Sequence, residues 1–128
     1  MLEADVKRAV NEYLQYQENL GNLLHMRLNA GSFILTDTAG NFRRRVQGVK
    51  KGTADYVVFQ GVGYYLAHYG QSFEFCQPVP GCRVTFIECK STKGKTTKEQ
   101  DEFAEEVKRH HCRYFVIRDA DEIVEVLK

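Results

Sequence analysis

The stretch Val84-Thr85-Phe86-Ile87-Glu88-Cys89-Lys90 determines how the rest of the chain is interpreted. Its first four residues are β-branched or aromatic, which favours a buried strand. Because side chains alternate along a strand, Glu88 and Lys90 share a face, with backbones about 6.6 Å apart. Cys89 points to the other face, and its carbonyl oxygen lies between them. Such a set suits a hard divalent cation and a positioned water, although a bare Glu-x-Lys is more often a surface pair.

Length and composition indicate one domain, expected to span residues 1–128 and large enough to bury a core. Apolar content and charge are ordinary for a globular protein, and the formal net charge of +1 indicates no particular partner. The distribution is uneven, because five basic and no acidic residues lie between Asp37 and Asp55, and four lysines and no acid lie between residues 90 and 98. These runs are expected to form a phosphate-facing surface; either alone is equally typical of a solvated face.

The four cysteines do not determine the redox compartment. The chain shows no signal peptide and no apolar run of membrane-spanning length, which favours a cytoplasmic protein without a membrane partner. A zinc site can be drawn from Cys76, Cys82, Cys112 and the histidines at 110–111. Their spacing matches no common zinc module, so zinc is the less favoured interpretation.

Residues 2–20 have the apolar periodicity of an amphipathic helix, which Gly21-Asn22 ends. Glu3 lies on the apolar stripe, so it either complements the positive helix start or reaches into a site at the edge of the core. The rest of the stripe is expected to contain Leu2, Val6, Ala9, Val10, Tyr13 and Leu14. The polar side is expected to contain Asp5, Lys7, Arg8, Asn11 and Glu12.

A short strand or an extended segment is then expected at 23–28. Strands are expected at 32–36, 42–46 and 55–59, with a hairpin loop at 37–41 and a basic loop at 47–52. Residues 60–82 are interpreted as an elaborated hairpin between two core strands, with a further strand at 73–75. Its turns are expected at Gly61, Gly63, Gly70, Pro78, Pro80 and Gly81.

A polar loop at 91–95 leads into a helix that ends near His110. Its start offers two capping boxes, Thr96 with Glu99 or Thr97 with Gln100. Gln100 also lies on the apolar stripe of this helix, and an inward-facing amide needs a polar partner. A strand at 114–117 and a short helix at 122–127 complete the chain.

Asp55 and Glu88 therefore belong to strands that are expected to converge at one end of a sheet, together with Lys90. Two carboxylates and a carbonyl oxygen hold Mg²⁺ or Mn²⁺, and the ion polarises a phosphate and lowers the pKa of a bound water. The lysine orients that water or stabilises developing charge. This combination indicates phosphodiester hydrolysis.

In this order, Gly52-Thr53-Ala54-Asp55, Phe86-Ile87-Glu88-Cys89-Lys90 and Thr96-Thr97-Lys98-Glu99-Gln100 resemble the VRR-NUC (virus-type replication-repair nuclease) domain of the PD-(D/E)XK superfamily. Arg27-Leu28-Asn29-Ala30-Gly31 and Arg113-Tyr114-Phe115-Val116-Ile117 support the resemblance, as does the early helical Glu3. It extends over nearly the whole chain, as in stand-alone, often phage-encoded members. Residues 1–128 are therefore expected to be one VRR-NUC domain.

The resemblance implies an α/β fold of the PD-(D/E)XK restriction-endonuclease type, with a mixed central sheet flanked by helices. It also implies a Mg²⁺- or Mn²⁺-dependent DNA endonuclease. Asp55 and Glu88 would bind the metal, Cys89 would give its backbone carbonyl, and Lys90 would be the catalytic lysine. Gln100 would stand beside the site as a further catalytic residue.

Glu3 would support the metal through a water molecule in the same family pattern. Stand-alone members resemble Holliday-junction resolvases and form homodimers, which implies a homodimer acting on branched DNA in phage replication, recombination or repair. The expected location is the cytoplasm of a bacterium or phage-infected host. The expected DNA contacts are Arg27, Arg43, Arg44, Arg45, Lys50, Lys51, Lys93 and Lys95.

Two features depart from the family pattern. Ala54 stands where a proline is common, and the gap between Asp55 and Glu88 is long, so 60–82 is expected to be an insertion. Two other functions stay open. A nucleic-acid-binding module without catalysis predicts salt-sensitive binding and no cleavage, and an RNA nuclease on the same scaffold differs only in substrate.

Overall fold

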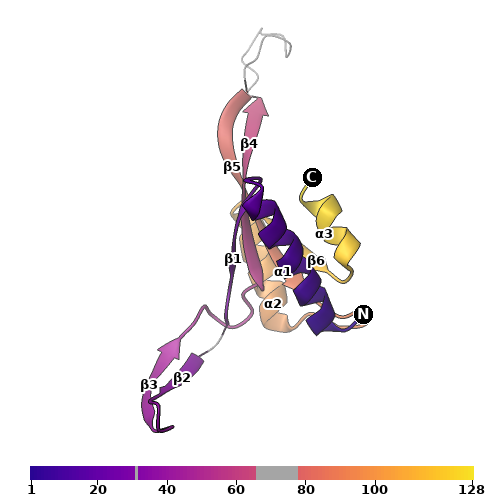
Figure 1. The fold of residues 1–128 in the computed structure, drawn as a ribbon. Helices are drawn as coiled ribbons and strands as arrows, with labels where there is room; N and C mark the ends of the chain where they lie inside the picture. Colours follow the sequence, from indigo (N-terminus) through magenta and orange to yellow (C-terminus); the bar gives the residue numbers. More distant parts are fainter. Residues whose placement is uncertain (31, 66–77) are drawn as a thin grey trace.

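The structure is a computed structural model that describes residues 1–30, 32–65 and 78–128 (Figure 1). The elements in chain order are α1 (Glu3–Asn19), β1 (Leu24–Arg27), β2 (Ser32–Thr36), β3 (Phe42–Gln47), β4 (Tyr56–Tyr65), β5 (Pro78–Cys89), α2 (Lys98–Arg109), β6 (Arg113–Ile117) and α3 (Ala120–Val126).

The central sheet has four strands in the order β1-β4-β5-β6. The pairs β1–β4 and β4–β5 are antiparallel, whereas β5–β6 is parallel and is connected through α2. A parallel neighbour needs such a crossover, and a helix is its usual form. The prediction of an α/β protein with a mixed sheet and flanking helices is confirmed.

Side chains alternate between the two faces of the central sheet, and those on one face pack against α1 and α3. The core on this face joins Val10 of α1 and Ile123 of α3 to Tyr56, Ile87 and Cys89 of the sheet. On the other face, Phe103 of α2 contacts Phe86 and Tyr114, with ring centroids 5.2 and 6.2 Å apart. Glu88 is two residues after Phe86 on the same strand, so its side chain projects to the same face of the sheet, which α2 covers.

Helix α1 agrees with the expected range except at its start. Val6, Val10 and Leu14 are fully buried. Leu2 was expected on the apolar stripe, but it is 71% exposed, so that assignment is wrong. Leu2 is the extended N-cap residue that precedes the first helical turn, and the helical periodicity does not apply to it.

At the start of α2, one of the two possible capping boxes forms. The Thr97 hydroxyl accepts from the Gln100 N–H (3.2 Å), and the Gln100 side chain accepts from the Thr97 N–H (2.9 Å). Thr96 instead donates to Asp101 at 2.6 Å. Acidic residues in the first turn and basic residues in the last turn also complement the helix dipole.

Two β-ribbons project from the central sheet in opposite directions (Figure 1). Strands β2 and β3 form a separate antiparallel pair, which projects from the end where β4 begins. Beyond Phe59 and Thr85, β4 and β5 pair only with each other, as far as Tyr65 and Pro78. In the segment predicted as an elaborated hairpin, residues 60–82, the described residues on both sides of 66–77 therefore form paired strands.

Five predicted turn residues belong to these paired strands, so their assignment as turns is wrong: Gly61, Gly63, Pro78, Pro80 and Gly81. A two-stranded ribbon has an open edge on each strand, where a proline without an N–H loses no ladder bond. Glycine and proline are therefore tolerated here, although both are poor residues for a central strand. Gly70 and the strand predicted at 73–75 lie outside the described residues.

Candidate active site

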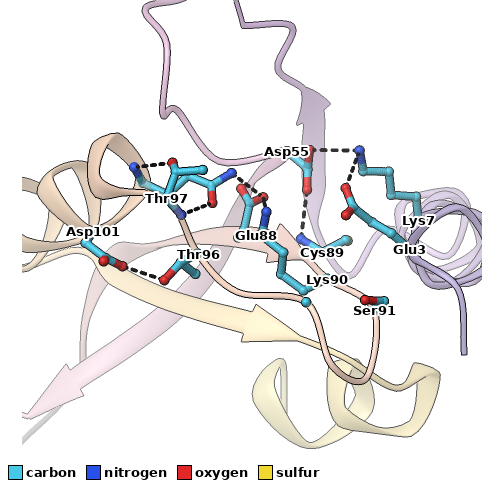
Figure 2. A network of polar contacts seen from close by, with 12 residues as sticks. Glu3, Lys7, Asp55, Glu88, Cys89, Lys90, Ser91, Thr96, Thr97 and Asp101 are labelled. Atoms are coloured by element: carbon cyan, nitrogen blue, oxygen red, sulfur yellow. Dashed lines mark hydrogen bonds and ion pairs between the residues drawn. The ribbon is translucent and has the colours of Figure 1, made fainter.

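Antiparallel pairing places the start of β4 beside the end of β5. Tyr56 is opposite Ile87, so Asp55 lies next to Glu88 and Cys89 at one end of the sheet. The Cys89 N–H donates to Asp55 Oδ2 at 2.7 Å. In Figure 2 the side chains of Asp55, Glu88 and Lys90 gather at this end, between the starts of the two long helices.

Glu88 and Lys90 form an ion pair that is almost completely removed from water. Glu88 is 2% exposed and Lys90 is 8% exposed. Lys90 Nζ lies 3.5 Å from Glu88 Oε1, and Gln100 Nε2 donates to the same oxygen at 3.0 Å. The capping box thus fixes Gln100 so that its amide group reaches the buried carboxylate.

The second oxygen of Glu88, Oε2, is buried without a hydrogen-bond partner among the described residues. Burial, followed by the negative charge of Asp55, raises the pKa of Glu88 to about 7, against the opposing effect of Lys90. A buried polar atom of this kind is costly unless a ligand completes it. Glu88 Oε2 is therefore the atom of the site that most clearly requires a partner.

The Asp55 side of the site is more open and contains a second lysine. Lys7 Nζ lies 3.1 Å from Glu3 Oε1 and 3.6 Å from Asp55 Oδ1 (Figure 2). The Lys7 and Asp55 side chains are 35% and 22% exposed. Burial alone lowers the pKa of Lys7, but the charge of Asp55 and the bond to Glu3 outweigh it and raise that pKa.

From the sequence, Lys7 was expected on the polar side of α1 and was given no role in the site; its side chain is 35% exposed, and the structure places its ammonium group beside Asp55. The long side chain of Lys7 reaches from α1 to Asp55 Oδ1. One signal was available in the sequence, because Glu3 and Lys7 are an (i, i+4) pair and share a side of the helix. Glu3 itself contacts Lys7.

The donors expected for a metal ion fit a hard divalent cation. Asp55 and Glu88 supply carboxylates, and Glu88 Oε2 has an unused coordination position. The N–H of Lys90 points to β6, where it donates to Ile117. Residue 89 therefore directs its N–H and C=O to the opposite side, toward Asp55. Mg²⁺ commonly binds one or two carboxylates and keeps several waters, so three protein oxygens are sufficient.

In the described ranges, no group of three or more His, Cys, Asp and Glu side chains is arranged to hold a metal ion. The two-carboxylate set at Asp55 and Glu88 is smaller than such a group. The zinc site considered from the sequence is not formed either, as far as the described residues show: no such cluster contains Cys82, Cys112, His110 or His111. Cys76 lies outside the described residues.

The expected DNA contacts are distributed over two strands and two loops. Arg43, Arg44 and Arg45 are exposed on β3 of the projecting β2–β3 ribbon. Arg27 ends β1 and borders the same surface hollow as Lys7. The other four are exposed on the two loops: Lys50, Lys51, Lys93 and Lys95.

Two of these loop lysines have partners on α2. Lys51 Nζ lies 3.7 Å from Glu99 Oε1, and Lys50 Nζ lies 6.0 Å from the centre of the Phe103 ring. Gly52 keeps this loop close to α2, since its φ is +91° and a Cβ there would approach the Glu99 carbonyl oxygen to 2.5 Å. A larger residue would displace the loop that leads into Asp55.

A scan against models of protein families finds no match, and a search of curated proteins finds no similar sequence. Among the described residues, no helix has both the length and the apolar character needed to cross a membrane. A proposal about function therefore depends on the geometry at the end of the sheet.

Proposed function

We propose that this protein is a metal-dependent endodeoxyribonuclease with a PD-(D/E)XK-type fold, as the resemblance to VRR-NUC domains implies. The observation that carries the proposal is the buried Glu88, with Lys90 on one oxygen, an unpartnered second oxygen, and Asp55 beside it. A structural ion pair gains little from a second carboxylate that raises the pKa of the first.

In this proposal Asp55, Glu88 Oε2 and the Cys89 carbonyl hold Mg²⁺ or Mn²⁺. The bound ion supplies Lewis acidity toward the phosphate and an acidified water. Glu88 must be ionised to act as a ligand, and its pKa of about 7 makes it partly protonated at neutral pH. Loading of the site is therefore expected to rise with pH through neutrality and to release a proton.

Lys90 and Gln100 have different roles in this mechanism. Lys90 Nζ lies close enough to Glu88 to donate to a water or phosphate oxygen at the site, and it stabilises the charge that develops there. Gln100 donates to Glu88 Oε1 and leaves Oε2 for the ion. Gln100 is thus a positioning residue, and Lys90 is the proposed catalytic residue.

The substrate surface that we propose extends from the site onto the β2–β3 ribbon. This ribbon combines Arg43–Arg45 with large exposed apolar residues, of which Ile34 is 58% and Phe42 66% exposed. Arginines bind phosphates, and a two-stranded ribbon fits a DNA groove. Branched DNA as substrate, a homodimeric assembly and a cytoplasmic location are proposals that rest on the family resemblance.

The test is a cleavage assay with purified protein on four-way junctions, flaps, forks and plain duplex, with Mg²⁺, Mn²⁺ or EDTA. We expect metal-dependent cleavage with a preference for branched substrates, and its loss in Glu88→Gln. Absence of cleavage on every substrate, in protein shown to be folded and to bind DNA, would contradict the nuclease proposal.

The same assay separates the two alternative functions. DNA binding that weakens with salt, without cleavage, would support a binding module, for which the exposed arginines of the ribbon are the favouring observation. Cleavage of RNA but not of matched DNA would support an RNA nuclease. Sedimentation of the same preparation tests the homodimer.

A further inference from the structure

The contacts of Lys7 assign a role to a residue outside the proposed catalytic set. Its ammonium group lies between two carboxylates, 3.1 Å from Glu3 Oε1 and 3.6 Å from Asp55 Oδ1. Asp55 comes directly before β4, whereas Glu3 and Lys7 lie on the first turns of α1. The ammonium is therefore a cation held at the carboxylate that the proposed metal ion needs.

The two oxygens of Asp55 are not equivalent. Oδ2 accepts the Cys89 N–H at 2.7 Å, and pairing of β4 with β5 sets that bond. Oδ1 faces Lys7. Oδ2 already uses one of its lone pairs for the Cys89 N–H, which makes Oδ1, the oxygen that Lys7 faces, the more available one for a divalent ion.

Lys7 also has a second carboxylate partner, Glu3, that it can keep when its contact with Asp55 is broken. Glu3 is the nearer of its two partners and lies on the same helix. Because the Glu3 contact is the shorter of the two, we expect a rotation of the Lys7 side chain away from Asp55 to keep it. The exchange of one cation for another at Asp55 therefore needs no movement of α1.

We propose that Lys7 is a resident cation that competes with the divalent ion for Asp55 and so sets the ion concentration at which the site is loaded. This inference rests on the proposed function. In the metal-free protein Lys7 balances the charge of Asp55, and it withdraws to Glu3 when the ion binds. Like charges at this distance repel, so the two cations cannot both occupy the position beside Oδ1.

The experiment measures Mn²⁺ binding directly, by titration calorimetry or by the electron paramagnetic resonance signal of free Mn²⁺, without DNA. Four variants are compared with the wild type: Lys7→Gln, Lys7→Arg, Asp55→Asn and Lys108→Gln. Lys108 lies in the last turn of α2, at the far end of the helix from the site, so its variant removes one positive charge elsewhere. Thermal unfolding establishes that each variant is folded.

We expect Lys7→Gln to bind Mn²⁺ about two- to fivefold more tightly, the range given by partly exposed ion pairs. Lys7→Arg keeps the competing charge and is expected to bind like the wild type, as is Lys108→Gln. If Lys7→Gln does not fold, Lys7→Met keeps the aliphatic part of the side chain and replaces it.

Wild-type or weaker affinity in the Lys7 variant, together with lost affinity in Asp55→Asn, would overturn the competition and leave the metal site standing. A purely structural ion pair predicts that result, with a lower melting temperature and no gain in Mn²⁺ affinity. Wild-type affinity in Asp55→Asn would instead show that the ion does not use Asp55, and the proposed metal site would fall as well.

Discussion

The two sides of the candidate site contain the same kinds of groups in different environments. On the inner side, Glu88 and Lys90 pair with side-chain exposures of 3% and 10%. On the outer side, Lys7 pairs with Glu3 and Asp55, and these side chains are 22–42% exposed. The inner pair lies between the sheet and α2, whereas the outer group lies at the edge where α1 begins.

The difference shows that burial, more than ion pairing, determines how far the pKa of a charged group shifts and how much the group changes the free energy of unfolding. Glu88 pairs with Lys90, yet its pKa rises to about 7 because burial, together with the negative charge of Asp55, outweighs the effect of the lysine. Water screens the outer group, and exposed pairs typically contribute only about 0.2–1 kcal/mol. We therefore expect large effects from changes on the inner side and small ones on the outer side.

The largest expected effect is on cleavage in Lys90→Ala. Removing a charge that acts in the transition state costs about 100-fold or more in rate. Lys95→Ala, in the exposed loop that follows, is the matched control and is expected to lose only a few-fold through weaker DNA binding. The measurement is single-turnover cleavage with Mg²⁺, with folding checked by circular dichroism. Equal losses in the two variants would remove the distinction between buried and exposed lysines.

The next effect is on the pH dependence of stability, measured without metal in wild type and Glu88→Gln. The pKa of Glu88 is raised in the folded state from 4.5 to about 7, so its stabilising contribution is complete below pH 4.5 and is lost as pH rises through 7. Between pH 5 and 8 the wild type should lose ~2–3 kcal/mol that Glu88→Gln does not lose, since one pKa unit corresponds to about 1.4 kcal/mol.

Urea unfolding at both pH values provides the comparison. Glu102→Gln removes an exposed carboxylate from α2 and is the control for the loss of one acid. It should keep the wild-type slope of stability against pH. A Glu88→Gln protein with the same slope as the wild type would mean that Glu88 is not held in the environment described above.

A smaller effect separates the two functions of Gln100. Gln100→Ala removes the donor to Glu88 as well as half of the capping box, whereas Thr97→Ala removes only the cap. Each should destabilise the protein by about 1 kcal/mol through the cap. Only Gln100→Ala should also move the pH midpoint of cleavage upward, by about half a unit, because a donor to a carboxylate favours its charged form. The pH–rate profiles of both variants test this.

The inner side could be read from the sequence because its contacts follow from short-range rules. Strand alternation places Glu88 and Lys90 on one face, and the spacing of Thr97 and Gln100 predicts a helix start with an inward amide. Both features depend on residues within a few positions of each other. The contact between Gln100 and Glu88 is the exception, because it depends on how α2 packs on the sheet.

On the outer side, the sequence predicts Asp55 in the site and Glu3 near it, but the contact of Lys7 with Asp55 could not be predicted, because it joins segments that are distant in sequence. Helical periodicity placed Lys7 on the polar side of α1, and no local pattern predicts that its side chain reaches Asp55. Gly61 and Pro80 were misinterpreted for a related reason. Turn propensity is local, whereas β4–β5 pairing beyond the central sheet is a property of the whole ribbon.

The smallest expected effect tests the outer side itself, through Glu3→Gln. Glu3 is 42% exposed and pairs with Lys7, so its loss should change the free energy of unfolding by only about 0.5 kcal/mol from the ion pair and the helix dipole. Asp5→Asn is a matched control, because Asp5 lies in the same helical turn and pairs with the exposed Arg8. Urea unfolding should give similar values for both. A loss above about 1.5 kcal/mol in Glu3→Gln alone would place it with the buried charges. Water would then not screen the outer group, and Lys7 would be held at Asp55 too firmly to exchange with an ion.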